Sequence, residues 1–133
     1  MKNAFRIIIS LLPFLYMGLI WFLSSNPDDL VVELKSSRID SFMKESLHLI
    51  EFAILYLLFA AALKVNGRLT PALNMMAAIA AGLYGVLDEY HQSFIPSRSS
   101  SLIDVIKDVT GVIIAWLLVK RGARPHIPFI SRR

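Results

Sequence analysis

The sequence has no cysteine, which removes disulfides, thiolate metal ligands and thiol chemistry from the functions open to it. It is also poor in charge: 18% of the chain is Asp, Glu, Lys or Arg, whereas 56% is apolar and the mean hydropathy is +0.59. A soluble domain of this length carries a smaller apolar fraction. These values predict a single domain, residues 1–133, that belongs in a membrane.

A basic patch is also lacking, although the formal net charge is +4. The Lys and Arg residues are found mainly at the two ends of the chain and in one short turn around residue 66. A nucleic-acid surface needs basic side chains gathered on one face or one helix. The sequence therefore argues against nucleic acid as a partner.

Four apolar segments each approach the roughly 20 residues with which a helix crosses a bilayer. They span residues 7–23, 47–63, 69–87 and 102–119. The first follows Lys2 and Arg6, as the apolar part of a signal peptide would, but no A-x-A site follows it and three further segments do. We therefore predict an all-α, polytopic membrane protein with four transmembrane helices, the first of them uncleaved.

The basic residues that flank these segments predict the orientation in the membrane. Nine precede the first segment, bracket the turn at 64–68 or follow the fourth segment, whereas only four lie in the other two loops. No acidic residue precedes the first segment, lies in the turn at 64–68 or follows the fourth segment. Because positively charged loops stay in the cytoplasm, both termini, the turn at 64–68 and the basic tail 120–133 are predicted to be cytoplasmic.

The first outer loop, residues 24–46, contains a helix start of its own. The segment NPDD at 26–29 offers a capping residue, a proline at the first helical position and acids near the positive end of the helix dipole. Leu30, Val31 and Leu34 would form one apolar stripe. We expect a short interfacial helix that lies against the membrane surface.

Ionisable side chains gather at the outer ends of the segments. Lys44, His48 and Glu51 are four and three residues apart, so they share one face of the second helix. Asp104 and Asp108 are also four apart, at the outer end of the fourth. A carboxylate in hydrocarbon costs a few kcal/mol or more, so it usually faces a bundle interior or water. We expect these side chains to turn toward one polar pocket that is open to the outer face.

A loop predicted over residues 88–101 completes this pocket. Glu89 and Asp104 form its predicted acidic core, and Arg98 is the only Lys or Arg in the loop. His91 is expected to be solvated in the same loop. The predicted ligand-binding residues are Lys44, His48, Glu51, Asp88, Glu89, Gln92, Arg98, Asp104 and Asp108.

Four stretches of the chain carry a family resemblance. They are WFLSS at 21–25, KESLHLIEFAILYLL at 44–58, DEYHQSFIPSR at 88–98 and SLIDVIKDVTG at 101–111. Over about residues 16–119 the sequence resembles the VanZ-like family of small bacterial membrane proteins. The resemblance implies a cell-envelope protein of the bacterial cytoplasmic membrane, in a family whose founding member is linked to low-level teicoplanin resistance. Many members have asparagine where this chain has Asp108, which implies a less strict requirement for that carboxylate.

Three functions fit the predicted pocket. One is a structural ion network that fixes helix register. Another is a binding site for the phosphate or carboxylate head group of a membrane lipid, a lipid-linked cell-wall precursor or a glycopeptide antibiotic, with Arg98, Lys44 and Lys107 receiving the anion. The third is a membrane-embedded hydrolase or transferase acting on lipid phosphates, with Glu89 and Asp104 as candidate catalytic residues. In this function Glu89, Asp104 and Asp108 serve as general acid or base, or they hold a divalent metal together with His48 or His91.

The cofactor and the oligomeric state are less well defined by the sequence. Two carboxylates four residues apart and a separate histidine are a weak metal signal, and His48 is expected first to pair with Glu51, so no metal site is predicted. The sequence has no phosphate-binding glycine loop and no acyl-transfer triad, and it identifies no cofactor. A homodimer that completes the pocket fits four short helices, because alone they enclose little volume.

Overall fold

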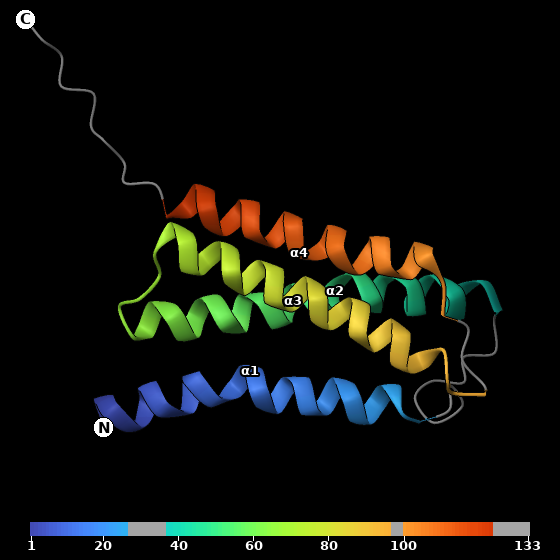
Figure 1. The fold of residues 1–133 in the computed structure, drawn as a ribbon, viewed down its shortest axis with the longest axis horizontal. Helices are drawn as coiled ribbons and strands as arrows, with labels where there is room; N and C mark the ends of the chain where they lie inside the picture. Colours follow the sequence, from blue (N-terminus) through green and yellow to red (C-terminus); the bar gives the residue numbers. More distant parts are fainter. Residues whose placement is uncertain (27–36, 97–99, 124–133) are drawn as a thin grey trace, which may run out of the picture.

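A computed structural model describes residues 1–26, 37–96 and 100–123, with the backbone alone at 37–45. This part of the chain forms four α-helices and no strand, which confirms the all-α prediction. The helices are α1 (Lys2–Ser24), α2 (Ser37–Val65), α3 (Pro71–Gln92) and α4 (Leu102–Gly122). They run alternately in opposite directions, so the N-terminus, the α2–α3 turn and the end of α4 lie at one end of the bundle (Figure 1).

Local signals explain where several helices begin. The side chain of Thr70 accepts a hydrogen bond from a backbone N–H in the first turn of α3, and Pro71 occupies the first helical position. Ser101 caps α4 in the same way by accepting from the N–H of Asp104. Between α2 and α3, Gly67 adopts a φ of +66°, a conformation that favours glycine. The predicted third segment therefore starts two residues too early, at Leu69.

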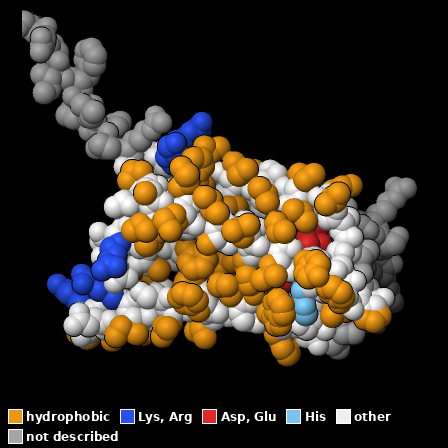
Figure 2. Space-filling view, viewed as in Figure 1, with side chains coloured by type: hydrophobic (Ala, Val, Ile, Leu, Met, Phe, Trp, Pro, Cys, Tyr) orange, Lys and Arg blue, Asp and Glu red, His pale blue; other side chains and the backbone are white. Residues whose placement is uncertain are grey.

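Three helices, α1, α2 and α3, are long and apolar enough to cross a membrane, α2 over Ser46–Val65. Their large apolar side chains cover much of the outer surface of the bundle (Figure 2), as with Phe14 on α1 and Leu83 on α3, which are 63% and 64% exposed. Such a surface suits lipid and would promote association in water. The fourth predicted segment, 102–119, lies within α4, and its crossing of the membrane stays a prediction.

The apolar core lies along the inner face of α2. Phe52, Leu55 and Tyr56 are fully buried there and pack against small residues of α3 and α4, including Ala81 and Ala115. α1 adds Ile20 to the same core. The small residues let the helices approach closely, as is typical of helix packing in membranes.

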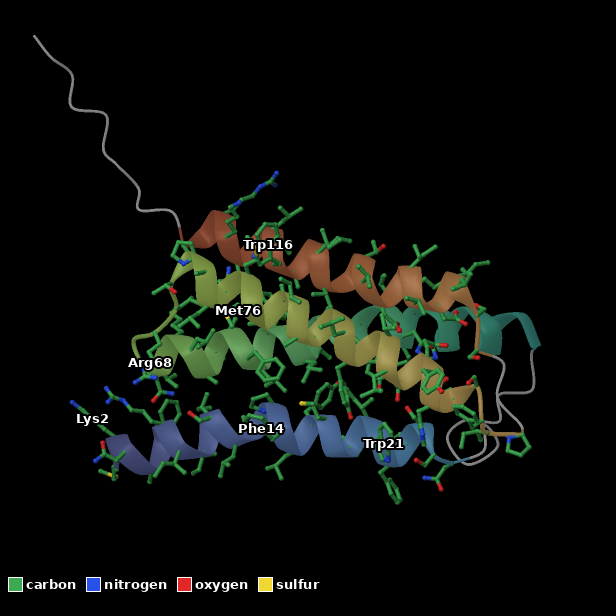
Figure 3. All side chains as sticks on the ribbon, in the orientation of Figure 1. Lys2, Phe14, Trp21, Arg68, Met76 and Trp116 are labelled. Carbon is green, nitrogen blue, oxygen red and sulfur yellow. The ribbon has the colours of Figure 1, made fainter. Side chains whose placement is uncertain are left out.

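Charged side chains are segregated between the two ends of the bundle (Figure 2). Lys2 and Arg68 lie at the end that holds the N-terminus, and Trp21 lies toward the other end (Figure 3). Of the described acidic residues, four lie toward that second end and one is central: Asp88 and Glu89 in the last turns of α3, Asp104 and Asp108 in the first turns of α4, and Glu51 at the middle of α2. This separation agrees with the charge asymmetry on which the predicted orientation depends.

Two loop predictions have different outcomes. α3 continues through Gln92, and the backbone N–H of Ser93 still donates a helical hydrogen bond to the carbonyl oxygen of Glu89. Residues 88–92 therefore belong to the helix and not to a loop. The loop predicted over 88–101 was wrong for these five residues, because charged residues mark the edge of the apolar segment but do not end a helix. The interfacial helix predicted after Asn26 lies outside the described residues.

Candidate functional site

The last two turns of α3 bury three polar side chains. Asp88, Glu89 and Gln92 are 0%, 4% and 3% exposed. Asp88 and Gln92 are four residues apart on one helix face, and the Gln92 amide donates to Asp88 Oδ2 at 2.7 Å. The same amide nitrogen donates to Ser24 Oγ at 3.3 Å. These bonds link the C-terminal end of α3 to the C-terminal end of α1.

His48 of α2, Glu89 of α3 and Asp108 of α4 meet beside this group, and we call these three residues the buried cluster. His48 Nδ1 lies 3.8 Å from Glu89 Oε1 and 3.8 Å from Asp108 Oδ1. One nitrogen or oxygen atom from each side chain lies within 4.8 Å of the other two. The carboxylates are enclosed, whereas the His48 side chain is 22% exposed. The cluster thus has an imidazole on its open side.

Two glycines bring the helices together at the level of the cluster. Gly111 lies one turn from Asp108, and a Cβ there would overlap the carbonyl oxygen of Leu49 on α2. On α3, a Cβ at Gly85 would come within 3.2 Å of the Cβ of Asp108. Helix backbones therefore contact each other next to the cluster. This contact fixes how far apart its three side chains are held.

The cluster supports two kinds of chemistry. A histidine and two carboxylates within 4.8 Å are nitrogen and oxygen ligands that can converge on one divalent cation. The same groups can take up and release a proton, as general acid–base chemistry requires. Both uses need access from outside, and the exposed part of His48 provides it.

A second histidine lies at the rim of the site. The ring of His91 stacks on Trp21, with centroids 3.9 Å apart and 24° between the planes. Its Nε2 lies 2.9 Å from Ser25 Oγ. The expectation that His91 is solvated in a loop was wrong, since it belongs to the last turn of α3 and makes a second connection to α1.

A family model described as VanZ/LLP1 matches residues 1–123. The chain belongs to the VanZ/LLP1 family. The match confirms the resemblance inferred from the sequence, and it agrees with a membrane protein. No curated protein and no solved structure matches the chain.

Asp104 is placed apart from the cluster in this VanZ/LLP1 chain. Its Oδ2 accepts a 2.7 Å hydrogen bond from Ser101 Oγ, and its Oδ1 lies 3.5 Å from Lys107 Nζ. The side chain is 21% exposed in the first turn of α4. Asp104 therefore takes part in the cap of α4, and Asp108, one turn further along the helix, is the α4 carboxylate beside Glu89 and His48.

The other predicted site residues are described to different extents. Glu51 lies on α2 three residues after His48 and is partly buried. Its predicted pairing with His48 stays a prediction, and the ion pairs of His48 given above are with Glu89 and Asp108. The side chain of Lys44 and all of Arg98 lie outside the described residues.

The sequence held two signals for contacts that were not predicted. Continuing the helical numbering through residue 92 would have paired Asp88 with Gln92. The glycine one turn after Asp108 would have indicated a close helix contact and thus a buried carboxylate. The stacking of Trp21 on His91 has no comparable signal, because it joins residues 70 positions apart.

Proposed function

We propose that this VanZ/LLP1 protein binds the polar or phosphate-bearing head group of an envelope molecule at the outer face of the bacterial cytoplasmic membrane. The candidate ligands are a membrane lipid, a lipid-linked cell-wall precursor and a glycopeptide-type drug. One observation carries the proposal: His48, Glu89 and Asp108, from three different helices, form a buried polar cluster at one end of an otherwise apolar bundle.

The cost of such a cluster favours a role in binding. Ionisable side chains within membrane segments are expensive, and they generally line binding sites or ion paths. Asp88 and Asp108 are both 0% exposed, so their carboxylates are buried between the helices and not on the surface of the bundle. A purely structural ion network is the competing explanation. In such a network every buried oxygen should have a hydrogen-bond partner, and Asp108 receives none on either oxygen from the described part of the chain.

The orientation supports an outward-facing site. Lys2, Arg6, Lys64, Arg68, Lys120 and Arg121 lie toward the end opposite to the cluster. With the basic end in the cytoplasm, both termini are cytoplasmic, α4 is the fourth membrane span and the cluster faces the cell exterior. Glycopeptide drugs and lipid-linked wall precursors are both present on that side. Altered sensitivity to teicoplanin is the corresponding phenotype.

The anion is received by basic groups near the mouth. Lys107 is 27% exposed and already paired with Asp104 at the start of α4. Arg98 and Lys44 are assigned to the same task from the sequence alone. A guanidinium binds a phosphate or carboxylate through two parallel hydrogen bonds, so Arg98 is the residue that would set head-group selectivity.

A second candidate function is catalysis on lipid phosphates by a membrane-embedded hydrolase or transferase. The observation in its favour is that His48 Nδ1 has a carboxylate oxygen of Glu89 and one of Asp108 at 3.8 Å each. Groups able to act as acid and base thus lie together, and they would have to approach further for direct proton transfer. Glu89, a member of the cluster, is then one candidate acid or base, and Asp104, in the first turn of α4, is the other. A homodimer that encloses the substrate more fully belongs to either function.

The head-group proposal is tested with purified protein in phosphatidylcholine nanodiscs. Binding of a polyprenyl phosphate and of phosphatidylglycerol is measured for the wild type, Glu89→Gln and Tyr56→Phe. The last variant is a matched control, because it removes a buried 2.7 Å hydrogen bond to Asn74 in the other half of the bundle. Saturable binding that only Glu89→Gln loses supports the proposal. Equal binding by all three proteins excludes the cluster as the site, and product formation that Glu89→Gln abolishes shows catalysis.

A further inference from the structure

We propose that His48, Glu89 and Asp108 bind a divalent transition-metal ion of the Zn²⁺ or Mn²⁺ type at the outer end of the bundle. The three side chains come from α2, α3 and α4, so the site joins the helices that form most of the core. The inference depends on the geometry of the cluster, on the burial of Asp108 and on the chemistry of the ligand set.

The spacing of the ligand atoms fits a single ion. Ligands at 2.0–2.2 Å from one metal ion lie roughly 2.8 to 4.2 Å from each other, depending on the coordination angle. His48 Nδ1 is 3.8 Å from Glu89 Oε1 and 3.8 Å from Asp108 Oδ1. One ligand atom from each of the three side chains lies within 4.8 Å of the other two. Side-chain adjustments of a few tenths of an ångström would bring them onto one ion without moving a helix.

Asp108 supplies a second and independent observation. Its side chain is 0% exposed, and neither carboxylate oxygen accepts a hydrogen bond from the described part of the chain. A buried carboxylate with unsatisfied oxygens is destabilising. Its Oδ1 lies on the side of His48, toward the centre of the cluster. A metal ion at that centre would satisfy this oxygen directly.

Neighbouring groups match a metal site as well. Asp88 adds another fully buried carboxylate next to Glu89 in the chain, and Gln92 holds its Oδ2 by a 2.7 Å hydrogen bond. Its carboxylate adds negative charge at the same end of the bundle, which favours a cation there. A dication would be a suitable partner for the buried, unsatisfied carboxylate of Asp108.

The ligand types decide between classes of metal. One imidazole nitrogen with two carboxylate oxygens suits Zn²⁺ and Mn²⁺, whereas Mg²⁺ and Ca²⁺ favour all-oxygen sites. Three protein ligands leave at least one position of the ion for water or an incoming oxygen. His48 is 22% exposed, so the cluster is not fully enclosed on the side of its imidazole.

The open coordination position of the ion could receive the head group itself. This part of the inference rests on the proposed head-group function. A phosphate brought beside enclosed carboxylates is repelled, whereas a phosphate oxygen bound to a shared dication is attracted. The ion would therefore let an acidic pocket receive an anionic head group. The ion site itself does not depend on what the head group is.

Metal content is measured on protein purified without a polyhistidine tag, treated with chelator, placed in nanodiscs and dialysed against Zn²⁺ or Mn²⁺. We expect about one ion per wild-type chain, with affinity at least about tenfold lower for Asp108→Ala and Glu89→Ala. His91→Gln and Asp104→Asn are matched controls, since they remove a histidine and a carboxylate at the same end of the bundle, and both should retain the ion. Metal at the level of empty nanodiscs, or lost equally in the controls, overturns the proposal.

A measurement on the wild type avoids dependence on variants that fold poorly. Pulsed electron paramagnetic resonance of the Mn²⁺-loaded protein should show coupling to one imidazole nitrogen, which changes when the histidines carry ¹⁵N. The signal should persist in His91→Gln. No imidazole coupling in the wild type, or its loss in His91→Gln, overturns the assignment to His48.

The two proposals fail in different ways. Polyprenyl phosphate binding is compared in chelated and in metal-loaded nanodiscs. One bound ion with no phosphate binding in either state leaves the metal site standing and removes the head-group function. Phosphate binding that is equal in both states, with no bound ion, removes the metal site and leaves the head-group function.

Discussion

His48 on α2 and Asp108 on α4 face each other across 3.8 Å in the half of the bundle opposite to the N-terminus (Figure 1), with Asp108 wholly buried and His48 partly exposed. The pair joins the two helices whose backbones also meet at Gly111 and Leu49. Helix packing and polar chemistry thus depend on the same few residues. Substitutions can separate these two contributions, because some change only charge and others change only the space between helices.

Replacing Glu89 with glutamine should abolish drug or lipid phenotypes while leaving membrane abundance nearly unchanged. The amide keeps the shape of the side chain and removes the charge that His48 faces at 3.8 Å. The comparison uses cells that carry the wild type, Glu89→Gln or Tyr56→Phe, with teicoplanin sensitivity and protein level measured together. If Glu89→Gln fails to accumulate in the membrane, the cluster acts mainly in folding.

Gly111→Ala should destabilise the bundle by about 1–3 kcal/mol or more, because its Cβ would overlap the carbonyl oxygen of Leu49. Gly82→Ala is the matched control on a neighbouring helix, since nothing lies within 4 Å of a Cβ at that position. The control should be neutral or slightly stabilising, as alanine has the better helix propensity. Thermal unfolding in detergent, followed by circular dichroism, gives both values. Equal stability of the two variants would contradict the close contact between α2 and α4.

Much of the fold could be predicted from the sequence because lipid imposes a simple rule on it. Apolar segments of membrane-spanning length have to be helical, and three of the four predicted segments overlap helices with the length and composition of spans. The end of α3 could not be predicted in this way, since hydropathy marks the apolar part of the helix and the backbone continues to Gln92. The start of α3 has a local signal in the sequence, because Thr70 is a capping residue and Pro71 occupies the first helical position.

The candidate site was predictable in composition and less so in arrangement. Helical spacing grouped Asp104 with Asp108, but it could not say which of them is enclosed. That depends on the rotation and depth of α4 against α3, which the contacts at Gly85 and Gly111 determine. In the structure Ser101 and Lys107 engage Asp104, which leaves Asp108 to meet Glu89 and His48.

The orientation in the membrane can be tested by labelling single cysteines. Because the sequence has no cysteine, each single-cysteine variant has only one thiol that can react. Phe94→Cys lies at the end with the cluster, where the native side chain is 67% exposed. It should react with an impermeant thiol reagent in intact cells. Asn66→Cys, in the exposed turn between α2 and α3, should react only after the membrane is opened. Labelling of Asn66→Cys from outside would place the cluster on the cytoplasmic face and remove the connection to extracellular drugs.

Arg98→Lys should weaken head-group binding almost as much as Arg98→Ala. Lysine keeps the positive charge, but its ammonium cannot form the two parallel hydrogen bonds with which a guanidinium binds phosphate or carboxylate. Lys107→Arg is the matched control, because a group that serves as a point charge beside Asp104 should tolerate arginine. Binding of a polyprenyl phosphate in nanodiscs is measured for the wild type and the three variants. If Arg98→Lys binds as well as the wild type, then Arg98 only balances the acidic residues of the pocket, and the selectivity of the site has to come from the buried cluster and the ion proposed for it.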